Sequence, residues 1–175
     1  MVTLILGFAI SSVSDWLKNR RESERERDAR REARHDQLSD QRRNFQRETL
    51  LALQEAVQDL ARATGAAHHQ DEMAFRTTGH WQRQLLGEGL NDQTHLANRR
   101  VMLLIVRVRD ESLRDVVTNF RQLTSQTQAI GRDVDDAELR NRSNVALQRA
   151  MPLLEQIHGR IGEILRTLDD EEAAV

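Results

Sequence analysis

The sequence has no cysteine and no tyrosine, a single proline, and aromatic residues at only 3% of its 175 positions. The absence of cysteine excludes a disulfide framework, cysteine-bearing zinc sites and thiol nucleophiles, and it is compatible with a reducing compartment. The scarcity of proline and aromatic side chains favours helix over sheet, as does the recurrence of Leu, Ala, Arg, Gln and Glu. A chain of this length holds one domain together with accessory segments.

A strong charge of one sign is also missing. Lysine and arginine number 26 and aspartate and glutamate 28, which gives a net charge of −2. Without a positive field the chain lacks the long-range attraction that draws proteins to nucleic acid, so we predict no nucleic-acid partner. Lys18 is the only lysine, and we interpret the resulting arginine bias as the mark of a GC-rich bacterial genome.

Residues 1–17, MVTLILGFAISSVSDWL, form an apolar run that is followed at once by Lys18, Arg20 and Arg21. The run predicts a membrane-anchor helix in the lipid bilayer, although it is shorter than the roughly 20 residues that usually span one. Trp16 lies where an interfacial aromatic belongs. The flanking positive charges predict a single span of the bacterial inner (cytoplasmic) membrane with the C-terminal body in the cytoplasm. The alternative is a core or interfacial helix of a cytoplasmic protein.

Residues 18–44 contain neither glycine nor proline and hardly any apolar side chain, and opposite charges recur among them at helical spacing. Glu26 with Arg30 and Asp28 with Arg31 are examples. Each such pair contributes about 0.2–0.5 kcal/mol, and several together can hold a solvated helix. We predict a charged helical stalk that spans about 40 Å at about 1.5 Å per residue. A polybasic lipid-binding patch is the alternative, but the interleaved acidic residues argue against it.

Residues 45–168 carry apolar side chains at intervals of three and four, which predicts an amphipathic helical bundle. We expect its first helix to continue the stalk and to end at Gly65. A second helix is expected over residues 67–86, before the glycine pair at Gly87 and Gly89.

A third helix is expected over residues 91–130. It contains the run VMLLIV, residues 101–106, which is apolar on every side. The chain offers no second strand with which such a run could pair, so we predict that it is the buried centre of the helix. Asp110 is suited to cap a restart of this helix before Leu113.

The last helix, expected over residues 136–168, carries the clearest pattern in the chain, because apolar residues occupy the a and d positions of a coiled coil. Pro152 lies inside this pattern, but the apolar phase is the same on both sides, which predicts one bent helix. An acidic flexible tail, residues 169–175, is expected to follow. The pattern predicts a packing and interaction seam made of Leu147, Ala150, Leu154, Ile157, Ile161, Ile164 and Leu168.

These elements predict an all-α fold in which an N-terminal apolar helix continues into a long charged helix and then into an antiparallel bundle of about four helices. The same seam could instead form a homodimer, and periodicity alone does not separate the two arrangements.

Few residues suggest metal or catalytic chemistry. His68, His69 and Glu72 are weak candidates for a divalent metal site, since His68 and Glu72 fall on one helix face. Acidic and polar residues are common at a helix start, however, where we expect these to lie. The chain has no Ser-His-Asp ordering, glycine-rich phosphate loop or HExxH motif. We therefore predict no catalytic residues, no cofactor and no enzyme activity, and we expect Trp81 in the core.

The order of segments resembles that of uncharacterised single-span, membrane-anchored helical proteins of actinobacteria. The residues that carry the resemblance are GFAISSVSDWLKNRRESERERDARREARH and, more loosely, LIVRVRDESLRDVV. The resemblance concerns the architecture and implies a bacterial lineage. It implies no mechanism, because that family has no assigned activity.

Three hypotheses about function remain. The first is a membrane-tethered cytoplasmic scaffold that binds a protein partner, or a second copy of itself, through one face of the bundle. The second is a soluble or peripheral bundle with a metal-dependent activity that uses His68, His69 and Glu72. The third, which rests on size and layout, is a phage-associated or defence-associated small membrane protein.

Overall fold

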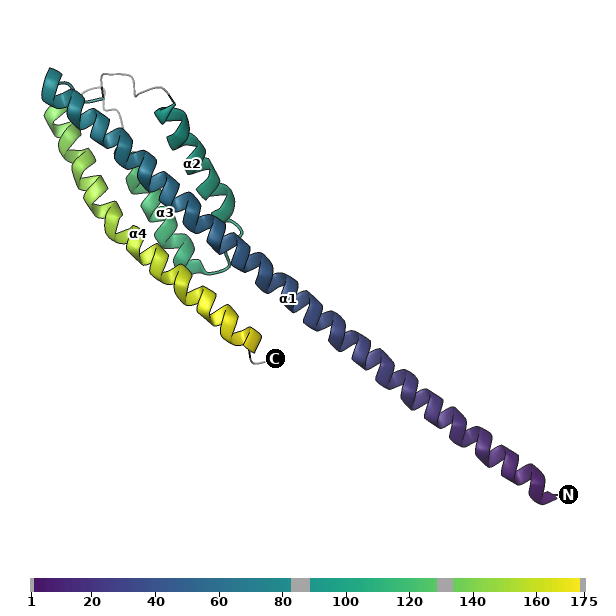
Figure 1. Ribbon diagram of the computed structural model, residues 1–175. Helices are drawn as coiled ribbons and strands as arrows, with labels where there is room; N and C mark the ends of the chain where they lie inside the picture. The colour runs from purple at the N-terminus through teal and green to yellow at the C-terminus, as the bar shows by residue number, and fades with distance from the viewer. Residues whose placement is uncertain (1, 83–88, 129–133, 174–175) are drawn as a thin grey trace. The chain divides into compact units, whose positions relative to one another are not determined.

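The computed structural model describes the backbone of residues 2–82, 89–128 and 134–173, and the side chains of residues 24–82, 89–128 and 134–171. The secondary structure of these residues consists of four α-helices and no strand (Figure 1). This confirms the predicted all-α class. The membrane-anchor prediction concerns residues 1–17, whose side chains lie outside the description. Among the helices that were described, none is both long and apolar enough to cross a bilayer.

Contacts divide the chain into two compact units, Met1–Asn44 and Phe45–Val175. The described side chains of the first unit are almost all exposed, as expected for a charged stretch with no apolar face. Two of the predicted ion pairs are present: Arg30 with Glu26 at 3.2 Å and Arg31 with Asp28 at 3.8 Å. Exposed pairs of this kind stabilise a helix only slightly, so this segment depends on their number and on its good helix formers.

The first helix, α1, runs over Val2–Thr78 and enters the second unit at residue 45. The predicted end at Gly65 and the separate helix over residues 67–86 are therefore wrong. A helical glycine costs about 1 kcal/mol relative to alanine. Here Ala63, Thr64 and Ala67 beside it are buried, and this packing outweighs the cost. The helix ends one residue before Gly79, whose φ of 74° lies in the left-handed region, where the Gly79 N–H donates to the Phe75 carbonyl at 2.8 Å.

The predicted helix over residues 91–130 is in fact two helices, α2 (Leu90–Ile105) and α3 (Glu111–Gln126). The predicted restart is confirmed, because the Asp110 carboxylate accepts a hydrogen bond from the Leu113 N–H at 2.7 Å. The chain between the two helices is fixed by a side chain of α1. Gln46 donates to the Arg107 carbonyl at 3.0 Å and accepts from the Arg109 N–H at 3.4 Å.

The last helix, α4, runs over Asp136–Ala173 and passes through Pro152 without a break, which confirms the prediction of a single helix. It begins at the predicted residue and continues past the predicted end at Leu168. Arg160 of α4 binds the carboxylate that caps α3, with its Nη2 2.6 Å from Oδ2 of Asp110. This ion pair ties the middle of α4 to the start of α3.

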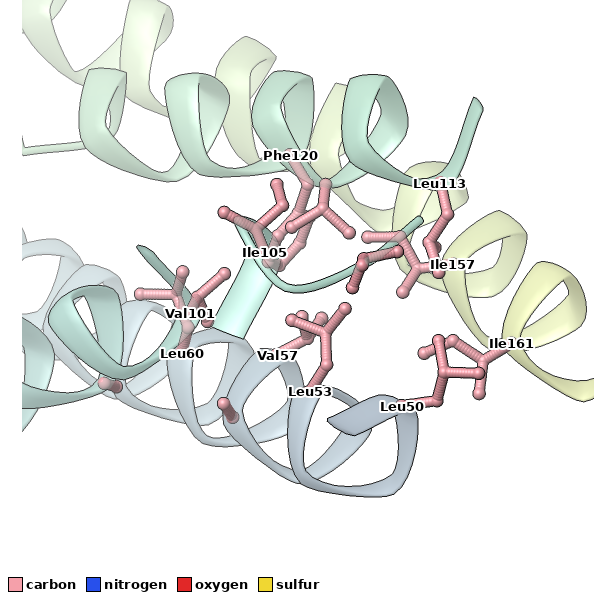
Figure 2. Packing of buried hydrophobic residues seen from close by; sticks show 14 of the residues in the cluster. Leu50, Leu53, Val57, Leu60, Val101, Ile105, Leu113, Phe120, Ile157 and Ile161 are labelled. Carbon is pink, nitrogen blue, oxygen red and sulfur yellow. The ribbon is translucent and has the colours of Figure 1, made fainter. Parts of the chain in front are cut away.

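The four helices of the second unit share one core, and successive helices reverse direction (Figure 1). Figure 2 shows Leu60 of α1 lying toward Val101 of α2 at one side of this core, and Leu50 of α1 toward Ile161 of α4 at the other. Burying an aliphatic side chain of this size contributes roughly 1.5–3 kcal/mol, so the cluster provides most of the stability of the fold. Its larger members are Leu50, Leu53, Val57, Leu60, Val101, Ile105, Leu113, Val117, Phe120, Ile157 and Ile161.

Candidate interaction surface

The predicted seam of α4 faces the chain's own core. Ala150, Ile157 and Ile161 are buried members of the core cluster. Three others, Leu154, Ile164 and Leu168, are partly buried and pack against it, and Leu147 is half-buried. Six of the seven seam residues therefore pack in the core of the same chain, and little of this stripe is open to another molecule.

Helix α2 has two apolar faces. Its inner face, with Ala97, Val101 and Ile105, is buried in the core. On its outer side Leu96 is 64% exposed, Met102 48% and Leu103 56%, and Val106, which follows the helix with helical dihedral angles, is 76% exposed. The prediction that the whole run of residues 101–106 is buried is therefore wrong. An unbroken apolar run has no polar face to show its orientation, and α2 is covered by the rest of the bundle on one side only.

We call Leu96, Arg99, Met102, Leu103 and Val106 the outer stripe of α2. Leu96, Arg99, Leu103 and Val106 are separated by three, four and three positions, so they form one row along the helix. Met102 lies beside this row and one turn before Val106. Apolar residues in such a row, exposed together, mark surfaces that bind other molecules more often than single exposed apolar residues do.

The charges around the outer stripe are mainly basic. Arg100 lies at its edge toward α1, where it binds Glu55 at 3.0 Å and Asp59 at 3.3 Å. Arg99 and Arg107 are exposed and form no ion pair with any residue that the structure describes. The stripe thus carries one arginine, Arg99, and is followed directly by another, Arg107, and the described part of the chain leaves both charges uncompensated.

A groove of about 580 Å³ lies between α1 and α2 at the N-terminal end of the outer stripe. Three alanines line it, Ala63, Ala66 and Ala97, and Leu96 contributes from the stripe. The groove is therefore continuous with the outer stripe through Leu96.

Neither a family model, nor a curated protein, nor a solved structure matches this chain.

The residues predicted as weak metal ligands point to different partners. Nε and Nη2 of Arg140 on α4 lie 2.7 and 2.6 Å from the two carboxylate oxygens of Glu72, and Nε of Arg76 lies 3.1 Å from one of them. The Nδ1 atom of His68 is 3.0 Å from the Ser143 hydroxyl, while His69 is exposed. In the parts of the chain described here, no three His, Asp or Glu residues are grouped so that they could hold a metal ion.

Trp81 is 1% exposed, which confirms that it is a core residue. It packs edge-on against His68, with ring centroids 5.4 Å apart, and against Phe75 at 6.2 Å. Burial lowers the pKa of His68, which is therefore neutral at pH 7. Beside Trp81, His68 belongs to a polar cluster with Ser143 and the Thr127 carbonyl. Sequence reasoning missed this cluster, because its members come from α1, α4 and the connection before α4.

The contact between Ser143 and His68 does not form a nucleophile. Ser143 donates its hydroxyl proton to the Thr127 carbonyl at 2.9 Å, so the hydroxyl oxygen accepts from His68. A serine nucleophile needs the opposite polarity, in which histidine removes the hydroxyl proton. Ser143 is also only 3% exposed. The cluster is better explained as a structural contact between α1, α4 and the Thr127 carbonyl.

Proposed function

We propose that this protein is a membrane-tethered helical scaffold that binds a protein partner through the outer stripe of α2. The supporting observation is the exposure of Leu96, Leu103 and Val106 in one row of a helix whose opposite face is fully buried. The other apolar row with heptad spacing, the α4 seam, is covered by the chain itself.

The exposed row is large enough to contribute to binding. Complete burial of a leucine or valine side chain contributes roughly 1.5–3 kcal/mol, and each of these side chains is more than half exposed. The loss of translational and rotational freedom on association costs several kcal/mol in turn. Contacts by three or four such side chains, together with charge pairs, suit a reversible interaction.

The tether is proposed for residues 1–17, with residues 18–44 as a spacer and the following unit in the cytoplasm. The apolar run and the basic residues after it support this placement. Within the spacer, the ion pairs of Glu26 and Asp28 support a solvated helix. A spacer of this kind lets the outer stripe meet a partner without competition from the bilayer surface. The resemblance to membrane-anchored actinobacterial proteins is in line with this proposal.

Membrane fractionation tests the tether. The full chain is expected in the membrane fraction, and a variant without residues 1–17 in the soluble fraction. If both proteins remain soluble, the tether is wrong and the binding role must be tested on its own.

In-cell photo-crosslinking tests the binding role. A photoreactive residue at position 106 is expected to give a crosslinked product that is lost with Leu103→Asp. Met151→Asp is the matched control. Met151 lies on α4, and its exposed fraction of 47% is similar to the 56% of Leu103. The product should persist in the control, and both variants should keep the wild-type circular-dichroism spectrum. A product that survives Leu103→Asp would contradict the proposal.

A further inference from the structure

We infer that the partner presents an amphipathic helix whose apolar row carries a carboxylate opposite Arg99. This inference rests on the proposed function, because it names the chemistry of the molecule that covers the outer stripe. A second copy of this chain and a bilayer surface are the two competing occupants, and the charges of the stripe disfavour both.

The outer stripe has the geometry of a helix-binding surface. Its row from Leu96 to Val106 covers about 15 Å of helix axis at about 1.5 Å per residue. Spacings of three and four residues let side chains of a second helix insert between those of the first. The row is interrupted by one charge, since Arg99 lies between Leu96 and Leu103.

Arg99 determines what can cover this row. A partner helix that packs on Leu96 and Leu103 removes water from the guanidinium between them. Removal of water from a charge without an opposite charge is strongly unfavourable, whereas a carboxylate can bind a guanidinium with two hydrogen bonds. No described residue of this chain pairs with Arg99, so the carboxylate has to come from the partner.

A second copy that packs its own α2 against this stripe supplies no carboxylate at this position. In a parallel pair of α2 helices, Arg99 lies opposite Arg99. In an antiparallel pair with Leu103 opposite Leu103, it lies opposite Arg107. In an antiparallel pair with Leu96 opposite Val106, Arg99 lies opposite Leu103. Each arrangement leaves the guanidinium beside a like charge or an apolar side chain, which is unfavourable.

The only acidic residue of α2 is Asp92 in its first turn. An antiparallel pair that brings Arg99 opposite Asp92 places Leu103 and Val106 beyond Leu90, the first residue of the facing helix. That register loses the two apolar contacts at the centre of the stripe. Pairing of two α2 helices therefore satisfies either the charge or the apolar row, but not both.

A bilayer surface is also a poor match. Helices that lie on membranes separate a charged face from an apolar face. On α2 Arg99 lies within the apolar row, and Asp92 lies seven residues before it on the same face. Insertion of this face would carry both charges toward the hydrocarbon. A protein helix can place an opposite charge at one position, which a fluid lipid surface cannot do.

Two designed peptides test the inference on the full-length protein. Both form the same amphipathic helix with a leucine row, and they differ in one residue, Glu or Lys, at the position that faces Arg99. Fluorescence anisotropy is expected to show that the Glu peptide binds at least about tenfold more tightly than the Lys peptide. Arg99→Glu should reverse this preference, and Leu103→Asp should abolish binding of both. The Met151→Asp control should bind as the wild type does.

The outcomes separate the inference from the proposed function. Equal binding of the two peptides, lost with Leu103→Asp, overturns the carboxylate inference and leaves the binding surface intact. Binding that survives Leu103→Asp contradicts the surface itself. Failure of both peptides to bind overturns the inference for a helix of this chemistry.

A dimer in sedimentation that Leu103→Asp dissociates favours a second copy of the chain as the occupant. Attachment of vesicles of phosphatidylcholine and phosphatidylglycerol that weakens with Leu103→Asp, compared with wild type, favours the bilayer.

Discussion

The seam of α4 and the outer stripe of α2 have the same kind of sequence pattern and opposite surroundings. Both are apolar rows with spacings of three and four. Ile157 in the seam is fully buried, whereas Leu103 in the stripe is 56% exposed. The difference follows from position, because the seam of α4 packs against the shared core from Ala150 to Leu168, whereas the buried residues of α2 all lie on its opposite face. A heptad pattern thus predicts that a face packs, but not what it packs against.

The largest expected effect comes from shortening one side chain in each row. Ile157→Ala should lower the free energy of unfolding by about 2–5 kcal/mol, because it leaves a cavity in the core. Leu103→Ala should change it by less than about 0.5 kcal/mol, since the side chain is largely in water already. Urea denaturation followed by circular dichroism measures both. Equal losses would show that the outer stripe is covered in the isolated protein.

A smaller effect is expected at the junction between α3 and α4. Asp110→Ala removes the cap of α3 and the partner of Arg160, and should cost about 0.5–2 kcal/mol of stability. Glu111→Ala is the control, because Glu111 is exposed next to the cap and should cost less. The hydrogen bond from Arg160 lowers the pKa of Asp110 in the folded chain.

The lowered pKa of Asp110 determines how the stability of this junction depends on pH. A carboxylate whose pKa is lower in the folded state stabilises the fold at pH values above its pKa in the unfolded chain, which is about 3.9. The contribution is lost as pH falls through the folded pKa. The difference between wild type and Asp110→Ala should therefore be full at pH 7 and shrink below about pH 4. A difference that grows on acidification would contradict the assigned ion pair.

The smallest effect on stability is expected from neutralising one carboxylate, either on a buried face or on an exposed face. Asp71 is 5% exposed, and burial raises its pKa. Its ionisation therefore destabilises the folded state once pH exceeds the unfolded value, so Asp71→Asn should raise the urea midpoint slightly at pH 7 but not near pH 4. Asp92→Asn, on the open face of α2, should not raise the midpoint, because a carboxylate in the first turn of a helix is stabilising. A lower midpoint for Asp71→Asn at pH 7 would contradict the assignment.

The elements that sequence could predict are those fixed by local chemistry. Asp110 was identifiable as a cap because its side chain satisfies an N–H only three residues away. The continuity of α4 through Pro152 followed from the unchanged apolar phase on both sides. These features depend on neighbours in sequence, so they need no knowledge of the tertiary structure.

The features that sequence could not predict depend on distant residues. Gly65 is helical because buried neighbours hold it in the bundle. The two faces of the VMLLIV run could not be told apart, since burial there is decided by where α2 lies on the bundle. The pairing of Glu72 with Arg140 joins residues of α1 and α4, and it occupies the carboxylate that a metal site would have needed.

The way Gln46 holds the chain after α2 has a consequence for how this protein can evolve. Its amide binds the main chain at residues 107 and 109 and does not bind their side chains. The shape of the loop is therefore insensitive to which side chain stands at either position. Arg107, at the end of the outer stripe, can be exchanged for a residue of another charge with little loss of stability. Partner preference could thus drift between lineages while the scaffold stays the same.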